Sequence, residues 1–166
     1  MNLADIRLLY EFNYWAKARM LGVVESLPEE DLYKDFKTSF KGIHGTLVHL
    51  CAAENVWLQR FTGNPSPKFL KVDDLPKYAD VKAKWLEVEN GMLAYISSLT
   101  EERLVETFSF VTSDGKSISN LRWHTLQHLV NHGTYHRGQI TSLIRQLGGT
   151  PVSTDLIAFY RQLKTK

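Results

Sequence analysis

The hydrophobic pattern along the chain predicts four long amphipathic helices. Apolar residues recur every three or four positions within each segment, which places them on one face of a helix. The segments cover residues 3–27, 43–61, 78–99 and 121–147. Pro28 ends the first segment, and Gly148 followed by Pro151 ends the fourth. A shorter pattern over residues 154–163 predicts a fifth, C-terminal helix.

The segment "TFSFVTSDGKSISN", residues 107–120, follows a different period. Apolar and polar residues alternate around Asp114-Gly115, which favours a short β-hairpin. Ser119 or Asn120 is then the expected N-cap of the helix that follows.

Four long helices with one apolar face each are most simply accommodated in a four-helix bundle. The sequence therefore predicts an all-α bundle with a short C-terminal helix and a small hairpin before the fourth long helix. The connection between the second and third long helices has enough residues to cross over. Simple up-and-down order is therefore not assured.

Composition and charge narrow the class of protein. A chain of 166 residues with 43% hydrophobic and 23% charged residues can bury one core, so we expect a single domain over residues 1–166. The net charge is +2 and the basic residues are scattered, so we expect no nucleic-acid partner. No uninterrupted apolar run of about 18 residues is present, so we expect no membrane span. A single cysteine and the charged residues near the N-terminus favour a cytoplasmic protein.

The fourth long segment carries histidines at positions 124, 128, 132 and 136. At roughly 100° per residue, His132 and His136 lie about 40° apart on the apolar face. His128 and His124 lie about 80° and about 120° from His136. Two imidazoles one helical turn apart can bind the same divalent ion. Core histidines bonded to carbonyl groups or water are the alternative.

His49 is the candidate third ligand, in the segment "GTLVHLCAAENVW". Small residues at positions 45, 52 and 53 leave space beside its ring, as a metal with an open coordination position requires. A close contact between helices is the alternative explanation for these small residues. Cys51 lies about 200° from His49 around the helix, so we expect it to be a packing residue. For His44 we expect exposure to solvent or a capping role.

Three segments together resemble the DinB/YfiT-like family, the DNA-damage-inducible family of metal-binding four-helix bundles. They are "FNYWAKARM", "GTLVHLCAAENVW" and "NHGTYHRGQI", in this order, and the resemblance extends over nearly the whole chain. It implies that His49, His132 and His136 form a metal triad whose other coordination positions are open to water or substrate. Many members of the family have a histidine where Tyr135 stands in this sequence.

The resemblance also implies a class of reaction. The family is similar in fold to mycothiol- and bacillithiol-dependent transferases and isomerases, in which a divalent metal can activate the thiol. We therefore expect a metal-dependent enzyme of the thiol S-transferase type, with Zn²⁺ or Ni²⁺, a small-molecule substrate and a low-molecular-weight thiol. A homodimer is expected from the resemblance and from the apolar residues of "VWLQRF", 56–61.

Two other functions stay open. A metal-dependent hydrolase is one, although the residue after His132 is a glycine and not the glutamate of an HExxH motif. A non-catalytic metal-binding or stress-response protein is the other, although a structural zinc site would need a fourth protein ligand.

Residues beside the histidines have less certain roles. Gln139 lies about 20° from His132 and could orient a ligand or contact substrate. For Arg137 we expect a structural hydrogen bond or ion pair, and for Gly138 a close helix crossing. Tyr135 is a conceivable proton donor, about 60° from the ligand pair. The sequence leaves the role of His128 undecided.

Overall fold

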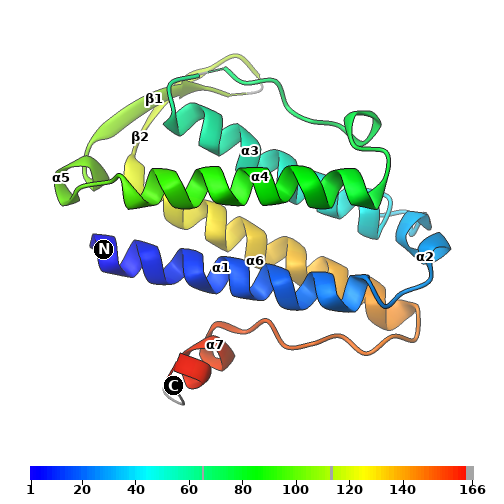
Figure 1. Ribbon diagram of the computed structural model, residues 1–166. Coiled ribbons are helices and arrows are strands. Elements are labelled where there is room, and N and C mark those ends of the chain that lie inside the picture. The colour runs from blue at the N-terminus through cyan, green and yellow to red at the C-terminus, as the bar shows by residue number, and fades with distance from the viewer. Residues whose placement is uncertain (65, 113, 164–166) are drawn as a thin grey trace.

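Four long helices form the body of the molecule. The computed structural model describes residues 1–64, 66–112 and 114–163. Figure 1 shows the long helices packed side by side. They are α1 (Leu3–Val24), α3 (Ile43–Phe61), α4 (Tyr78–Ser97) and α6 (Arg122–Gln146). The all-α four-helix bundle predicted from the hydrophobic pattern is confirmed.

The helices do not alternate in direction along the chain. Helices α1 and α6 run one way, and α3 and α4 both run the other way (Figure 1). Helix α4 can run parallel to α3 because the connection after Phe61 returns along the bundle before Tyr78. Helix α3 packs against α4 and α6, and α1 packs against the same two helices. The crossover that the long connection permits is therefore present.

Short helices occupy three of the connections. They are α2 (Glu29–Tyr33), the 3₁₀ helix η1 (Val72–Asp74) and α5 (Glu101–Leu104). None of these was predicted, because a single helical turn is too short to show a hydrophobic period. Pro28 precedes α2, and three acidic residues occupy the first turn of that helix, where the positive end of its dipole favours them. The predicted C-terminal helix is α7 (Leu156–Leu163).

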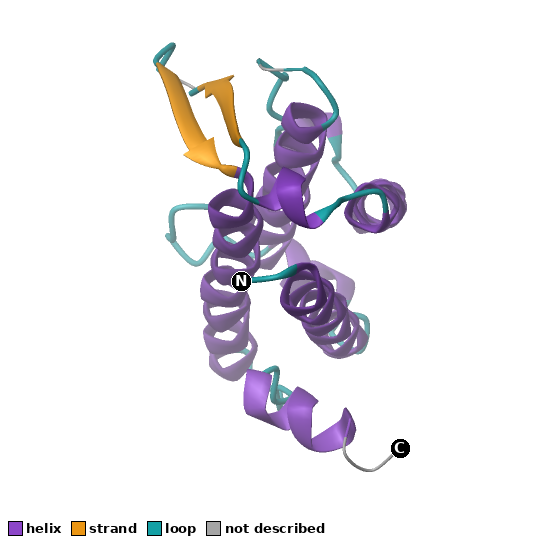
Figure 2. Cartoon of the chain, turned by 90° about the vertical axis from the view of Figure 1, so that its left-hand side faces the viewer, coloured by secondary structure: helices purple, strands orange, loops and turns teal. Residues whose placement is uncertain are grey.

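The predicted hairpin is confirmed. Strands β1 (Thr107–Val111) and β2 (Ser117–Leu121) pair in antiparallel register, with Phe110 opposite Ile118. Gly115 in the turn has a φ of +81°, which glycine adopts without steric cost, while Ser113 lies outside the described residues. Figure 2 shows the hairpin in orange beside one end of the bundle.

The predicted N-cap of the fourth long helix is wrong. Ser119 and Asn120 both lie inside β2, where their backbones pair with β1. Leu121 occupies the cap position, and its side chain makes no capping hydrogen bond. The strand runs directly into α6, so no loop residue is left to supply a side-chain cap.

The apolar faces of the helices meet in two core clusters. One includes Tyr10, Met92 and Leu126, and the other includes Leu47 and Ile140. The apolar side chains of residues 56–61 are buried or packed against the first cluster and the hairpin. These apolar side chains therefore give no support to a homodimer, which stays a prediction.

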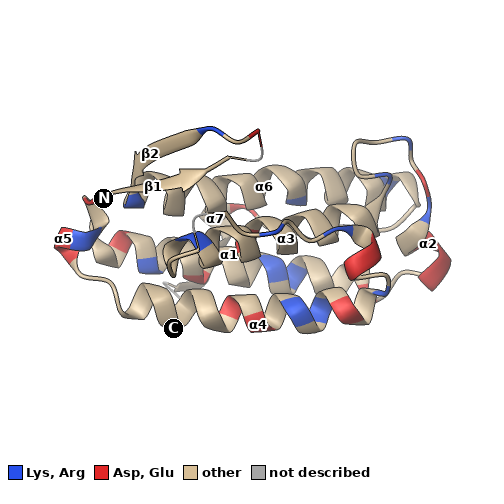
Figure 3. Ribbon diagram, turned by 90° about the horizontal axis from the view of Figure 1, so that it is seen from above, with Lys and Arg blue, Asp and Glu red and all other residues tan. Residues whose placement is uncertain are grey.

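Charged side chains of both signs cover the outer surface. Figure 3 shows Lys and Arg interspersed with Asp and Glu along α4, in keeping with the small net charge. Within the described ranges, no helix combines the length and apolar character needed to cross a membrane.

A buried polar network ties α6 to α1 and α3. Arg137 is only 3% exposed, and its Nη1 donates to Asn13 Oδ1 at 2.8 Å. Asn13 Nδ2 in turn donates to Glu54 Oε1 at 3.1 Å, and the Tyr14 hydroxyl donates to Glu54 Oε2 at 3.3 Å. Burial raises the pKa of Glu54 above its usual value. Arg137 thus makes the structural hydrogen bond expected from the sequence.

Gly133→Ala should destabilise the protein, although alanine is the better helix former. A Cβ at position 133 would lie 2.9 Å from Arg137 Nη1 and 3.0 Å from Asn13 Oδ1. Both atoms are buried and are hydrogen-bonded to each other, so moving them weakens a charge-assisted hydrogen bond. We expect a loss of about 1–3 kcal/mol in the free energy of unfolding, measured by urea denaturation.

Gly138→Ala is the matched control on the same helix. A Cβ there meets no other atom within 4 Å, so this substitution should stabilise the protein by about 0.5–1 kcal/mol. Equal effects of the two substitutions would show that the contact between Arg137 and Asn13 does not constrain position 133.

Candidate metal centre

Three histidine side chains converge between α3 and α6. The Nε2 of His49 lies 3.1 Å from that of His132 and 3.2 Å from that of His136, and the last two are 3.1 Å apart. Imidazole nitrogens about 2.0–2.1 Å from one ion lie about 2.8–3.4 Å apart, for angles between octahedral and tetrahedral. The three residues predicted from the sequence are thus brought together, in an arrangement that could hold a metal ion.

Hydrogen bonding orients one of the three rings. His136 Nδ1 lies 2.7 Å from Gln139 Oε1. Because the amide oxygen only accepts, the imidazole proton belongs on Nδ1, and the Nε2 lone pair is directed at the other two rings. Gln139 therefore orients a candidate ligand, one of the two roles that its position in the sequence suggested.

The surroundings keep two of the rings neutral. Burial, followed by the charge of His136, lowers the pKa of His49 to about 4. Burial, followed by the neighbouring histidines, also lowers the pKa of His132 to about 4. Both imidazoles are therefore unprotonated at neutral pH, as metal ligands must be.

Phe40 covers one side of the centre. Its ring stacks on His49 at 4.0 Å between centroids and meets His136 edge-on at 5.4 Å. The loop that carries it has left-handed backbone at Lys37 and Lys41, with φ of 58° and 65°. A Cβ on Gly45 would lie 2.0 Å from the carbonyl oxygen of Phe40. Gly45 thus allows the loop to approach, and does not leave the open space beside His49 that the sequence suggested.

A pocket of about 300 Å³ opens on the other side of the centre. His49 and His132 form part of its wall, and Ala53 supplies the small residue that leaves room. The other lining residues come from α3, the α3–α4 connection, the hairpin and α6: Val56, Trp57, Arg60, Phe69, Phe110, Thr112 and His128. A ligand in this pocket would reach the centre from its open side.

The remaining histidines lie in different surroundings. His128 lines the pocket, with its ring 5.9 Å from that of His132. His124 is exposed beside Trp123. His44 is only 4% exposed and lies against Tyr33, so the expectation of solvent exposure is wrong. That error arose because α2, which carries Tyr33, was not predicted.

Two other candidates are outside the site. Cys51 is fully buried in the core, and burial raises its pKa to about 12, so it is the packing residue expected. Tyr135 is 65% exposed and does not line the pocket, which removes the argument for a proton donor at this position.

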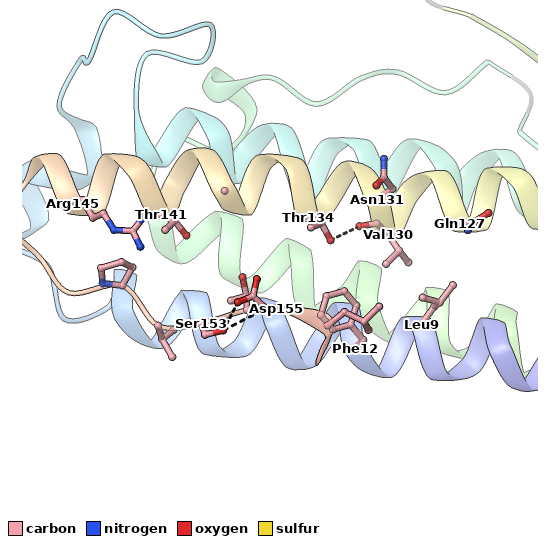
Figure 4. Close-up of a pocket in the computed structure, with 15 residues that line it drawn as sticks. Leu9, Phe12, Gln127, Val130, Asn131, Thr134, Thr141, Arg145, Ser153 and Asp155 are labelled. Atoms are coloured by element: carbon pink, nitrogen blue, oxygen red, sulfur yellow. Dashed lines mark hydrogen bonds between the residues drawn. The ribbon is translucent and has the colours of Figure 1, made fainter. Parts of the chain in front are cut away.

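A larger pocket of about 750 Å³ lies on another face of α6 (Figure 4). Its walls come from α6, α1 and residues 151–156, and include Arg145 and Asp155 but no histidine or cysteine. Gly138 also lines it, so the close helix crossing expected at this glycine is not found within the described residues. The candidate metal ligands therefore lie beside the smaller pocket and not beside the larger one.

Two comparisons with known proteins found matches that extend over nearly the whole chain. The sequence model of the DinB family matches residues 1–164. The chain is also similar to Protein DinB of Bacillus subtilis (strain 168), with 28% identity over 163 residues that cover 95% of each chain.

In metal-free protein, the free energy of unfolding should fall as the pH drops from 6.5 toward about 4. His49 and His132 have ordinary pKa values of 6.5 when unfolded and values of about 4 when folded. Between these limits the unfolded chain binds more protons, so protonation favours unfolding. His132→Gln should show a shallower fall. Urea unfolding of the chelator-treated wild type and variant over this pH range measures the two falls in free energy. Parallel curves for the two proteins would contradict the lowered pKa of His132.

Proposed function

The chain belongs to the DinB family, and on that premise we propose that it binds one divalent metal ion through His49, His132 and His136 and catalyses thiol S-transfer. The convergence of the three Nε2 atoms beside an open pocket carries the proposal. Zn²⁺ and Ni²⁺ are the ions we favour, because both bind imidazole nitrogen well. The small pocket suits a small-molecule substrate and a low-molecular-weight thiol.

The residues around the triad would have separate roles in the reaction. When bound, the ion would supply a full +2 charge that lowers the pKa of a thiol toward neutrality, since three neutral histidines do not offset it. Gln139 holds His136 in the ligating tautomer, and Phe40 shields one side of the rings from water. His128 is the imidazole on the pocket wall outside the triad, and we assign it the transfer of protons to and from the substrate.

The two other functions have less support. The hydrolase mechanism of an HExxH helix would need a carboxylate base beside the pocket, and the buried carboxylate of Glu54 is hydrogen-bonded to Asn13 and Tyr14 and does not line it. A structural metal would be closed by a fourth protein ligand. The candidate group contains three residues within the part of the chain that the structure describes.

Single alanine substitutions test the metal site. His49→Ala, His132→Ala and His136→Ala should each abolish tight binding, because two imidazoles are too few to hold the ion. The loss should exceed the roughly 10- to 100-fold typical of residues that only support a ligand. Elemental analysis and titration of protein purified without a metal-affinity tag measure the content and affinity.

Two further histidines serve as controls on α6. His124→Ala should keep full affinity, because its exposed side chain lies outside the site. His128→Ala should change affinity by about 10-fold at most, because its ring contacts His132 without a hydrogen bond. Full metal content in His49→Ala together with its loss in His128→Ala would overturn the assignment.

The reaction is tested separately with metal-loaded protein. It should accelerate conjugation of a thiol to an electrophile, in a screen of bacillithiol, mycothiol, glutathione and cysteine. Chelation should remove the rate, and His128→Ala should reduce it while keeping the metal. Metal-dependent hydrolysis of a model ester without thiol conjugation would favour the hydrolase instead.

A further inference from the structure

The pocket beside the three histidines extends along α3 as far as Arg60. Arg60 follows His49 by 11 residues, which turns it only about 20° around the helix and moves it roughly 16 Å along the axis. Arg60 lines the same pocket as His49, and its guanidinium lies over the ring of Trp57, which precedes it by three residues and so lies nearer to His49 along the helix. His49, Ala53 and Arg60 therefore line one continuous wall of the pocket.

Aromatic rings hold the Arg60 side chain in place. Its guanidinium carbon lies 4.8 Å from the ring centroid of Trp57 and 4.6 Å from that of Phe110. Its Nη2 donates to the carbonyl oxygen of Val111 in β1 at 2.8 Å. The hairpin and α3 thus fix a cation in the wall of the pocket.

This cation lacks an anionic partner within the described residues. Arg60 Nε is buried without a hydrogen-bond partner, and no described carboxylate forms an ion pair with the side chain. Arg122, by comparison, pairs with Glu106 at 3.3 Å. Burial lowers the pKa of Arg60, which reflects the cost of keeping this charge away from water. A guanidinium kept partly desolvated and unpaired beside a pocket is suited to bind an anion.

We propose that Arg60 binds a carboxylate group of the substrate or thiol whose other end reaches the three histidines. The proposal rests on the proposed function and identifies the class of small molecule. None of the described residues that line the pocket is acidic, and Trp57, Phe69 and Phe110 give the pocket apolar surface. The ligand is therefore an elongated monocarboxylate or dicarboxylate with an apolar middle and a metal-binding atom at its far end.

A purely structural role for Arg60 is the competing explanation, because its bond to Val111 joins α3 to the hairpin. The two roles differ in what they predict for charged and uncharged ligands. If Arg60 has only a structural role, its substitution should change the affinity for acids and for alcohols equally. If Arg60 binds the carboxylate, its substitution should lower only the affinity for the acids.

The test uses cobalt-loaded protein and a series of ω-mercaptoalkanoates from propanoate to octanoate, with the matching mercaptoalcohols. Thiol binding is followed by the visible absorption of Co²⁺. At the best length, the acid should bind about 10- to 100-fold more tightly than the alcohol, as expected for a charge-assisted hydrogen bond. Arg60→Gln should lose this preference and leave the affinity for the alcohol unchanged.

Two variants serve as controls. Arg60→Lys keeps the charge and should retain part of the preference. Arg145→Gln removes an arginine from the larger pocket on another face of α6 and should retain all of it. Equal affinity of acid and alcohol in the wild type, or an equal loss for both in Arg60→Gln, would overturn the proposal.

Calorimetric titration of metal-free protein with hexanoate tests whether Arg60 binds a carboxylate when no metal is present. Binding to the wild type that Arg60→Gln abolishes supports the carboxylate site, whereas binding that is absent or unchanged in the variant contradicts it. Failure of the wild type to take up Co²⁺ would instead contradict the proposed metal site. The two failures are therefore distinguishable.

Discussion

The packing of α3 against α6 around three facing imidazoles is the constraint on which the candidate site depends. Three Nε2 atoms lie within 3.1–3.2 Å of one another, and protonated rings at this separation would repel. Burial lowers the pKa values of His49 and His132 and so keeps them neutral. The hydrogen bonds from Arg137 through Asn13 to Glu54 connect the same two helices by way of α1. The bundle therefore holds the rings together through its own packing and hydrogen bonds.

The parallel arrangement of α3 and α4 determines which residues of their connection reach the site. Because the chain crosses over between these helices, the connection passes along the bundle and brings Phe69 to the pocket. The hairpin before α6 contributes Phe110 and Thr112 to the pocket wall. Helices supply the candidate ligands, together with Arg60 and His128, on rigid backbones, while the connection and the hairpin supply further residues of the pocket wall. Such a division permits different substrates on one metal-binding core.

The sequence predicted the long helices and the triad because both depend on helical period. His132 and His136 share a face in any helix over these residues, and His49 was selected with help from its small neighbours. The structure brings His49 to the other two histidines, but part of the reason for selecting it was wrong, since Gly45 admits the Phe40 loop. Phe40 itself could not be predicted, because its position depends on left-handed backbone at two lysines. The N-cap prediction failed because strand pairing, a tertiary contact, takes up Ser119 and Asn120.

Charge is separated between the core and the pocket. The carboxylate of Glu54 lies in the core, where Asn13 and Tyr14 donate to it, while the pocket wall carries Arg60 and two of the triad histidines. Had a carboxylate faced the pocket, it could have served as a further metal ligand or neutralised Arg60. Because no described carboxylate lines the pocket, the three histidines and the guanidinium stay available to groups from outside the chain. A ligand that is anionic at both ends, with a thiolate at one and a carboxylate at the other, would satisfy this arrangement without any change in the bundle.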